Sequence, residues 1–449
     1  MLNTDYTEFY PDIEEVVKEF VSFDGEITVN GKFNYDTFSV SVSIENRSYE
    51  YLYDYNPSDS RDEKRLKKRF LKLAAYKALS DFTGIKLPWG ALTGIRPTKL
   101  AYKQGDRFER FFKEVMLVSD KKTELIAKIL ETQKGIYSVD PDNTDLFISV
   151  PFCPSRCAYC SFISNEISKE KRINEYIDRL LDEIDASKSL IKNLRAVYIG
   201  GGTPVALSDE LFYKLLLGIG KQTTEYTVEA GRPDAISEFK LQMMKDFGVT
   251  RVCVNPQTFS DKTLKLIGRK HTSKDVIEKY ELVKSYGFDV NMDLIAGLYG
   301  ETKNDFENSL KTAVSLNPEN ITVHTLCLKS GSKLKESTDR LSDGEVSDMV
   351  EFAHEYLATN GYNPYYLYRQ KYMAGNLENT GYAKKGKECI YNVDIMEETT
   401  DILANGANAV SKRVENLEKI TRIGAPKNTD AYLKRVDELI EQKKLLFMR

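Results

Sequence analysis

Six short segments rich in β-branched and apolar residues alternate with amphipathic segments between residues 145 and 330. Strands are predicted near 146–150, 196–200, 226–230, 249–254, 289–294 and 321–326. Helices are predicted near 168–190, 208–220, 235–247, 274–287 and 302–315. Because helices that link strands in this order make right-handed crossovers, the alternation favours an α/β fold with a parallel sheet, as an open doubly wound sheet or a full or partial barrel.

The flanking regions have other patterns. Residues 1–140 are predicted to form an α+β module of unknown role, and the barrel region is assigned to 145–330. Residues 331–449 are predicted as an α+β substrate-binding region, because a helix near 344–360 precedes a tyrosine-rich segment and a charged final helix. In the N-terminal module, strands are predicted near 38–44 and 49–55, and helices near 61–80, 107–118 and 121–134.

Composition narrows the choice of partners. Lys and Arg number 64 against 68 Asp and Glu, so no global positive field attracts nucleic acid. Acidic residues fill the first 20 positions where a secretion signal needs a basic start, and no uncharged apolar run reaches the length of ~20 residues that spans a membrane. A cytoplasmic protein without a membrane span and without a nucleic-acid partner is therefore expected.

Three of the six cysteines lie within eight positions, directly after the first predicted barrel strand. Cys153, Cys157 and Cys160 follow the spacing C-x3-C-x2-C. Thiolates are the usual ligands of iron–sulfur centres, and a short loop can direct three of them at one cluster. Three protein ligands leave one iron open for direct binding of a substrate or cofactor, as in catalytic metal sites.

Two other interpretations of these cysteines are weaker. A structural zinc site needs four protein ligands, and none of the three histidines lies near the loop in sequence. Buried unreactive thiols are common in proteins, and Cys253 and Cys389 fit that description better than the clustered triplet does.

The triplet, with Tyr159 before its last cysteine, resembles the signature of the radical S-adenosylmethionine (SAM) superfamily. Motifs at later strand ends resemble the oxygen-independent coproporphyrinogen III oxidase or dehydrogenase-like branch: Gly-Gly-Gly-Thr-Pro at 200–204, Val-Glu-Ala-Gly-Arg-Pro at 228–233, Asn-Pro-Gln-Thr-Phe at 255–259 and Met-Asp-Leu-Ile-Ala-Gly-Leu at 292–298. Motifs at 87–99, 365–371 and 375–384 extend the likeness over nearly the whole chain. The resemblance implies a partial (β/α)6 TIM-type barrel.

The resemblance also implies the cofactors and their ligands. A [4Fe-4S] cluster would be held by the three clustered cysteines, with SAM beside it. The residues implied to contact SAM are Tyr159, Gly201, Gly202, Thr203, Glu229, Gln257, Arg269 and Asp293. Their types suit the task, because Arg can clamp a carboxylate with two donors and acidic groups can accept hydrogen bonds from hydroxyl or amino groups.

The implied activity is that of a metal-binding oxidoreductase of porphyrin and haem biosynthesis. In the family reaction, SAM cleavage yields a radical that takes hydrogen from the propionates of coproporphyrinogen III, and loss of carbon dioxide leaves the vinyl groups of protoporphyrinogen IX. The electron would come from a donor such as flavodoxin or ferredoxin. Candidate contacts to this tetrapyrrole are Tyr366, Tyr368, Arg369 and Lys371, in a segment that combines aromatic rings with cations.

Three positions differ from the decarboxylating group, which has a further Cys two residues after the cluster and a Tyr and a His in the preceding strand. This chain has Phe162, Phe147 and Ser149 there. Three functions therefore remain open: porphyrinogen decarboxylation, haem binding and delivery, and radical chemistry on another substrate, including haem ring opening or methyl transfer. His324 is interpreted as either a substrate contact or a core residue.

Overall fold

The computed structural model describes residues 1–20, 23–94, 96–160, 165–169, 171–327, 342–370 and 373–448. These form two compact units. One unit contains residues 1–127 together with 369–377, and the other contains 128–368 and 378–449. The sequence-based division at 140 and 330 stays a prediction, whereas the contacts place the change of unit inside helix α5 (Asp120–Thr132).

The N-terminal unit is built on a four-stranded sheet in the order β1-β2-β3-β4. Its strands are β1 (Leu2–Thr4), β2 (Ile27–Asn34), β3 (Thr37–Ile44) and β4 (Arg47–Asp54). The period-2 pattern of β3 buries Phe38 and every second residue after it, while the intervening serines face away. Helices α1 (Tyr10–Glu19) and α2 (Ser60–Thr83) pack on this sheet.

Both ends of α2 have recognisable capping residues. The carboxylate of Asp59 accepts a hydrogen bond from the Asp62 amide at the start, and Gly84 ends the helix with a φ of 74°. The expected helix at 107–118 is present as a continuous helical stretch of mixed type, in which a 3-10 turn (Gly105–Arg107) leads into α4 (Phe108–Arg110) and then into a π-helical segment at Phe111–Val115. Helix α3 (Pro97–Gln104) precedes them.

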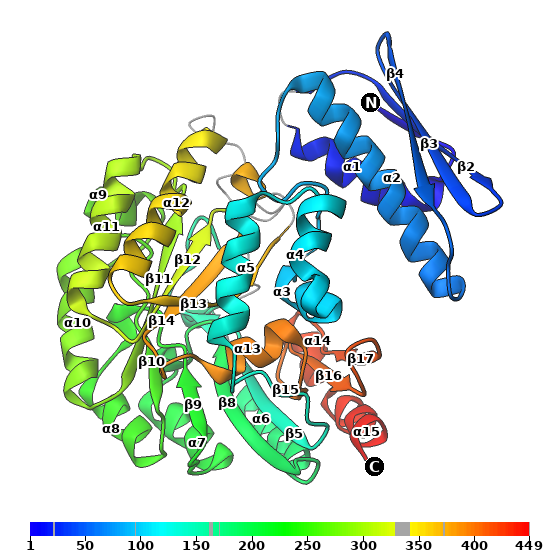
Figure 1. Ribbon diagram of the computed structural model, residues 1–449. Coiled ribbons are helices and arrows are strands. Elements are labelled where there is room, and N and C mark those ends of the chain that lie inside the picture. The colour runs from blue at the N-terminus through cyan, green and yellow to red at the C-terminus, as the bar shows by residue number, and fades with distance from the viewer. Residues whose placement is uncertain are drawn as a thin grey trace. The chain divides into compact units, whose positions relative to one another are not determined.

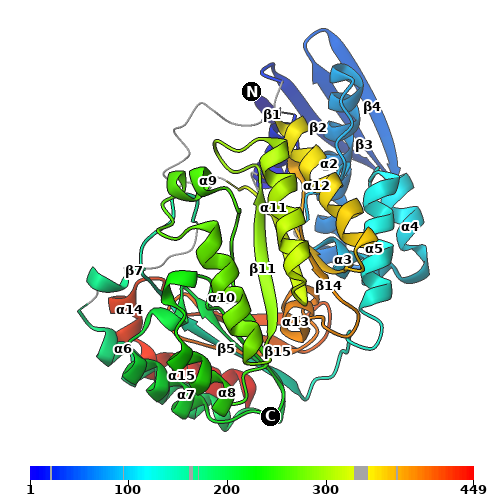
Figure 2. The same ribbon diagram turned by 90° about the vertical axis from the view of Figure 1, so that its left-hand side faces the viewer.

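The second unit contains the predicted barrel. Six parallel strands are hydrogen-bonded in sequence order: β5 (Asn143–Val150), β8 (Asn193–Gly201), β9 (Glu225–Val228), β10 (Arg251–Cys253), β11 (Asp289–Ala296) and β12 (Asn320–Thr325). The connecting helices are α6 (Ile173–Lys188), α7 (Asp209–Ile219), α8 (Glu238–Asp246), α10 (Ser273–Ser285) and α11 (Lys303–Leu316). Figures 1 and 2 show these helices on one side of the row of strands. The predicted α/β class and partial (β/α)6 barrel are confirmed.

The barrel is open, and the C-terminal region extends its sheet at both edges. Antiparallel strands β13 (Asn363–Tyr368) and β14 (Asn379–Ala383) continue the sheet beyond β12. Beyond β5 it continues with β15 (Asp401–Asn405), which is parallel to β5, and then β16 (Val410–Val414) and β17 (Ile420–Gly424). Helices α12 (Asp343–Thr359), α13 (Ile390–Glu397), α14 (Thr429–Leu433) and α15 (Val436–Phe447) complete the unit.

Buried apolar side chains of the strands and the inner faces of the helices form the core of this unit. Within the described part of the chain, no helix has the length and apolar character needed to cross a membrane.

Candidate active site

The cysteine loop leaves the carboxyl end of β5, the edge of a parallel barrel where catalytic groups usually collect. Cys153 lies in the short strand β6 (Phe152–Cys153), which pairs with β7 (Asn165–Glu166). Two backbone bonds shape the turn that follows: the Cys160 amide donates to the Cys157 carbonyl at 3.2 Å, and the Ala158 amide donates to the Ile267 carbonyl at 3.0 Å. The loop is therefore fixed to the barrel on one side.

The donor set of this loop fits an iron–sulfur cluster. All three thiols are partly accessible, and the Thr203 hydroxyl lies 3.5 Å from the Cys153 sulfur. Among the described residues, no three His, Cys, Asp or Glu side chains converge as they would around a single metal ion. The loop supplies three thiols, the donor type that iron–sulfur clusters use, and a cluster gives each thiolate an iron of its own.

The glycine turn after β8 runs against the start of the cysteine loop. Gly201 has a φ of 98°, which disfavours other residues. A Cβ atom on Gly202 would come within 2.5 Å of the Phe152 carbonyl oxygen and 2.8 Å of its nitrogen. The Thr203 amide donates to the same carbonyl at 2.7 Å. This turn therefore holds the strand that leads to Cys153, a role that the sequence interpretation did not assign to it.

Glu229 follows β9 and is half-buried. Its carboxylate accepts hydrogen bonds from the Tyr198 hydroxyl and, at 3.3 Å, from the side-chain amide of Asn255. Burial, together with the nearby charge of Asp293, raises the pKa of Glu229 to about 7 although these donors oppose the shift. The carboxyl can therefore exchange a proton near neutral pH.

Asp293 and Gln257 are held together by the backbone. The Gln257 amide donates to the Asp293 carbonyl at 2.8 Å, and Gln257 has a φ of 66°. The Asp293 carboxylate lies 3.6 Å from the ring of His324 and accepts from Asn291 at 2.8 Å. Burial opposes ionisation of Asp293, but these polar neighbours outweigh it and lower its pKa, so the group stays an anion.

Arg269 is buried among acceptors. It donates to the Asn255 carbonyl at 2.6 Å and to the Tyr159 hydroxyl at 3.2 Å. Burial disfavours its charge, yet Tyr159 and Cys157 raise its pKa above the ordinary value. Its Nε and the Asn255 side-chain oxygen are both buried without a hydrogen-bond partner. Orphaned donors and acceptors of this kind fit the carboxylate and amino groups of SAM.

Two of the four predicted substrate contacts lie on β13, next to the strand ends. The Tyr368 hydroxyl is 3.4 Å from Nδ1 of His324, and the Tyr366 hydroxyl is 3.4 Å from Oγ1 of Thr322. His324 therefore links Tyr368 to Asp293, so that both of its ring nitrogens have polar neighbours. Lys371 lies outside the described residues.

Arg369 belongs to the N-terminal unit. Its guanidinium donates to the Leu92 carbonyl and to Asn376, and it lies 5.2 Å from the centre of the Trp89 ring. Glu19 lies 3.8 Å away. Because the residue is 3% exposed and its guanidinium contacts these neighbours, the structure gives it a packing role in place of the predicted contact to the tetrapyrrole.

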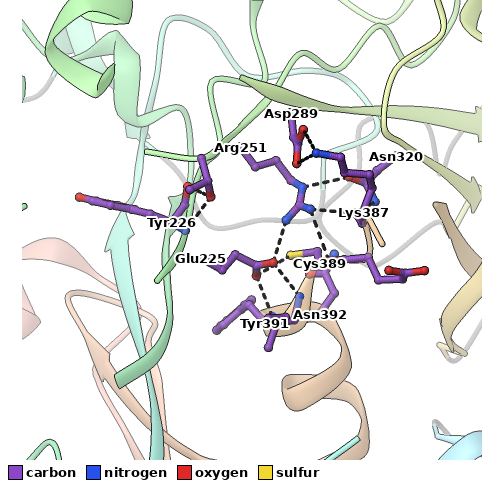
Figure 3. Close-up of polar contacts among 12 residues, drawn as sticks. Glu225, Tyr226, Arg251, Asp289, Asn320, Lys387, Cys389, Tyr391 and Asn392 are labelled. Carbon is purple, nitrogen blue, oxygen red and sulfur yellow. Dashed lines mark hydrogen bonds and ion pairs between the residues drawn. The ribbon is translucent and has the colours of Figure 1, made fainter. Parts of the chain in front are cut away.

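The amino ends of the strands carry a separate buried network, shown in Figure 3. Arg251 donates to Glu225 and to Asn320, each at 2.9 Å, and to the Lys387 carbonyl at 2.8 Å. Glu225 also accepts from the amides of Ile390 and Tyr391 at the start of α13. This network closes the end of the barrel opposite to the cysteine loop.

Aromatic rings connect this network to the site. The Tyr391 ring stacks on that of Tyr198 at 4.6 Å between centroids, and the Tyr198 hydroxyl reaches Glu229. Phe147 stacks on the same pair. Tyr198 and Asn255 therefore orient Glu229. The sequence interpretation gave neither residue a role, and only Asn255 was part of a quoted motif.

Comparison with known proteins agrees with this geometry. A family model described as Radical SAM superfamily matches residues 147–313. The chain is similar to the oxygen-independent coproporphyrinogen-III oxidase-like protein HemZ of Bacillus subtilis (strain 168), with 38% identity over 391 residues that cover 81% of this chain and 78% of that protein. It is also similar to the heme chaperone HemW of the same organism, with 36% identity over 192 residues that cover 41% of this chain and 50% of the chaperone.

The fold is similar to the solved structure of coproporphyrinogen III oxidase (HemN) from Escherichia coli, a radical SAM enzyme. The TM-score is 0.55 at 21% identity, and the match covers 71% of this chain and 72% of that one. The chain belongs to the radical SAM superfamily, in its oxygen-independent coproporphyrinogen-III oxidase-like branch. This superfamily uses a [4Fe-4S] cluster and SAM.

Glu229→Gln is expected to change how stability depends on pH. The folded-state pKa of about 7 exceeds the ordinary value of 4.5, so wild-type stability falls as pH rises through this window. Glutamine cannot ionise, so the free energy of unfolding of the variant relative to wild type should rise between pH 5 and pH 8 by on the order of 1–3 kcal/mol. Urea unfolding of both proteins without SAM measures this difference in the free energy of unfolding. The same difference at pH 5 and at pH 8 would contradict the raised pKa of Glu229.

Proposed function

We propose that this protein is a radical SAM oxidoreductase that converts propionate groups of coproporphyrinogen III into vinyl groups, giving protoporphyrinogen IX. The observation that supports this most is the similarity to the HemZ protein, which extends over 81% of the chain and so includes the regions outside the barrel. We place the reaction in the cytoplasm.

In this proposal, Cys153, Cys157 and Cys160 hold the cluster. SAM lies against the groups at the strand ends: Tyr159, Gly201, Gly202, Thr203, Glu229, Gln257, Arg269 and Asp293. When bound, the cluster and SAM supply the electron transfer and the radical that start the reaction. The chain would contribute orientation: Arg269, whose buried Nε lacks a hydrogen-bond partner, would hold the SAM carboxylate, while Glu229 and Asp293 would accept hydrogen bonds.

The substrate change balances in atoms and electrons. Each reacting propionate loses one hydrogen atom, one molecule of carbon dioxide and one electron, and a vinyl group remains. The hydrogen atom goes to the 5′-deoxyadenosyl group, giving 5′-deoxyadenosine, and the released electron needs an acceptor. SAM cleavage separately consumes one electron, for which we propose a donor of the flavodoxin or ferredoxin type. Tyr366 and Tyr368 lie beside Thr322 and His324 of β12, and we propose that they contact the tetrapyrrole.

Anaerobic protein with a reconstituted cluster, mixed with SAM, a reductant and coproporphyrinogen III, provides the test. The expected products are protoporphyrinogen IX and 5′-deoxyadenosine, detected by chromatography after oxidation of the porphyrins. A Tyr368→Phe variant should keep its SAM cleavage without substrate and lose affinity for coproporphyrinogen. SAM cleavage by the wild type with no loss of carbon dioxide under any reductant would contradict the decarboxylation.

Haem binding and delivery is the second candidate, and Ser149 favours it. Its hydroxyl is buried and donates to the Ala407 carbonyl at 2.7 Å, so this position directs no group at a substrate. The HemW relatives are named heme chaperones. Stoichiometric haem binding without porphyrinogen turnover would support this candidate, and SAM cleavage with neither result would indicate another substrate.

A further inference from the structure

Arg232 is a buried cation beside the cysteine loop, in the motif that follows β9. Its side chain is 4% exposed. Two of its nitrogens, Nε and Nη2, form a fork on the two carboxylate oxygens of Asp234, each bond 2.9 Å long. Such paired bonds fix the plane of the guanidinium, so the direction of the third nitrogen is determined as well.

That third nitrogen, Nη1, points at the loop. It donates to the Ser155 hydroxyl at 3.0 Å and lies 3.9 Å from the sulfur of Cys157. Asp234 is partly exposed and its pKa is lowered by His271 and Arg232 in spite of burial, so it remains an anion that holds the fork. Neither Arg232 nor Asp234 is among the groups assigned above to the cluster or to SAM.

We propose that Arg232 sets the reduction potential of the bound cluster by donating to the Cys157 thiolate, with Asp234 as its positioning residue. This inference rests on the proposed binding of the cluster by the three cysteines. Hydrogen bonds to cluster sulfurs and nearby charge are the means by which a protein tunes an iron–sulfur potential. Reduction adds one negative charge to the cluster, so a buried cation beside a ligand sulfur stabilises the reduced form.

The consequence concerns the electron donor. A cation at this place raises the potential of the cluster and so widens the range of donors that can reduce it. A neutral residue at position 232 would restrict the protein to stronger reductants. Cys153 has a hydroxyl neighbour, Thr203, so Arg232 makes the surroundings of the ligand sulfurs unequal.

The test compares Arg232→Gln and Arg232→Lys with wild type in an anaerobic redox titration of the reconstituted cluster, with iron content measured in parallel. Arg232→Gln should lower the reduced-to-oxidised ratio at a fixed solution potential at least tenfold, which is about 59 mV for one electron. Arg232→Lys keeps the charge but loses the fork, so its shift should be smaller. Arg179→Gln, which removes an equal charge on α6 from pairs with Asp182 and Asp437, should leave the potential unchanged.

The outcomes separate the possible roles. In one outcome, Arg232→Gln binds less iron per chain while its remaining clusters keep the wild-type reduction potential. That result would show that Arg232 only supports the loop, and it would overturn the proposal. If Arg232→Gln fails to load iron, Arg232→Lys decides: a potential equal to that of wild type contradicts the sulfur contact. Failure of the wild type to bind a cluster would instead refute the proposed function.

Discussion

Replacing any one of Cys153, Cys157 or Cys160 with alanine is expected to abolish the iron–sulfur absorption of the purified protein, and SAM cleavage with it. The physical reason is that thiolates are the cluster ligands and the loop from 151 to 160 contains no further thiol to take over a lost position. Iron and sulfide per chain after anaerobic reconstitution, with the visible spectrum, measure the effect.

Cys389→Ala is the matched control. Cys389 is buried at the amino ends of the strands, and its sulfur lies 3.3 Å from Glu225. This variant should bind as much iron as wild type, because the thiol lies at the amino ends of the strands and the cysteine loop lies at their carboxyl ends. A triplet variant that kept a nearly full complement of iron would overturn the assignment of the ligands.

Arg251→Ala is expected to lower the free energy of unfolding by about 3–5 kcal/mol, the usual range when one partner of a buried ion pair is removed. The variant leaves Glu225 without its cation and deprives Asn320 and the Lys387 carbonyl of a donor. Because Glu225 also holds the start of α13, which carries Tyr391, SAM affinity should fall as well. Urea unfolding and calorimetric SAM titration test the two effects.

An exposed ion pair provides the comparison. Lys274 lies 3.6 Å from Glu278 on α10, and both side chains are largely in solvent. Lys274→Ala should cost no more than about 0.5 kcal/mol, because solvent and salt screen such pairs. Similar losses in the two variants would show that burial of the Arg251 network contributes little to stability.

The barrel was predictable because its information is local. The six strands are short runs rich in β-branched and apolar residues, the five predicted helices between them are amphipathic, and the strand-to-helix alternation constrains the topology. The short helix α9 (Asp261–Leu266) was missed because a single turn and a half carries little periodicity. Pairing between distant segments has no such signal, so the addition of β13, β14 and β15 to the sheet edges was not foreseen.

The candidate site shows the same limit. The sequence alone predicts that motifs at the ends of successive parallel strands lie close together, because those ends share one edge of the sheet. It does not predict which residues a long side chain contacts. Arg369 lies among residues near position 90, 277 positions earlier in the chain, and Arg232 turns toward a loop that precedes it by 75 positions. Both are parts of quoted motifs, yet only the folded chain shows what their guanidinium groups contact.

The pairing of β15 with β5 also determines when the sheet of the barrel unit can be completed during synthesis on the ribosome. Ser149 in β5 and its acceptor Ala407 are 258 positions apart, so at ~5–20 residues per second about 10–50 s separate their synthesis. Until β15 emerges, the strand that leads to the cysteine loop has an unprotected edge, which invites association with other nascent chains. We therefore expect iron insertion to follow release of the finished chain, and a chain that terminates before residue 400 to aggregate in place of forming a smaller active barrel.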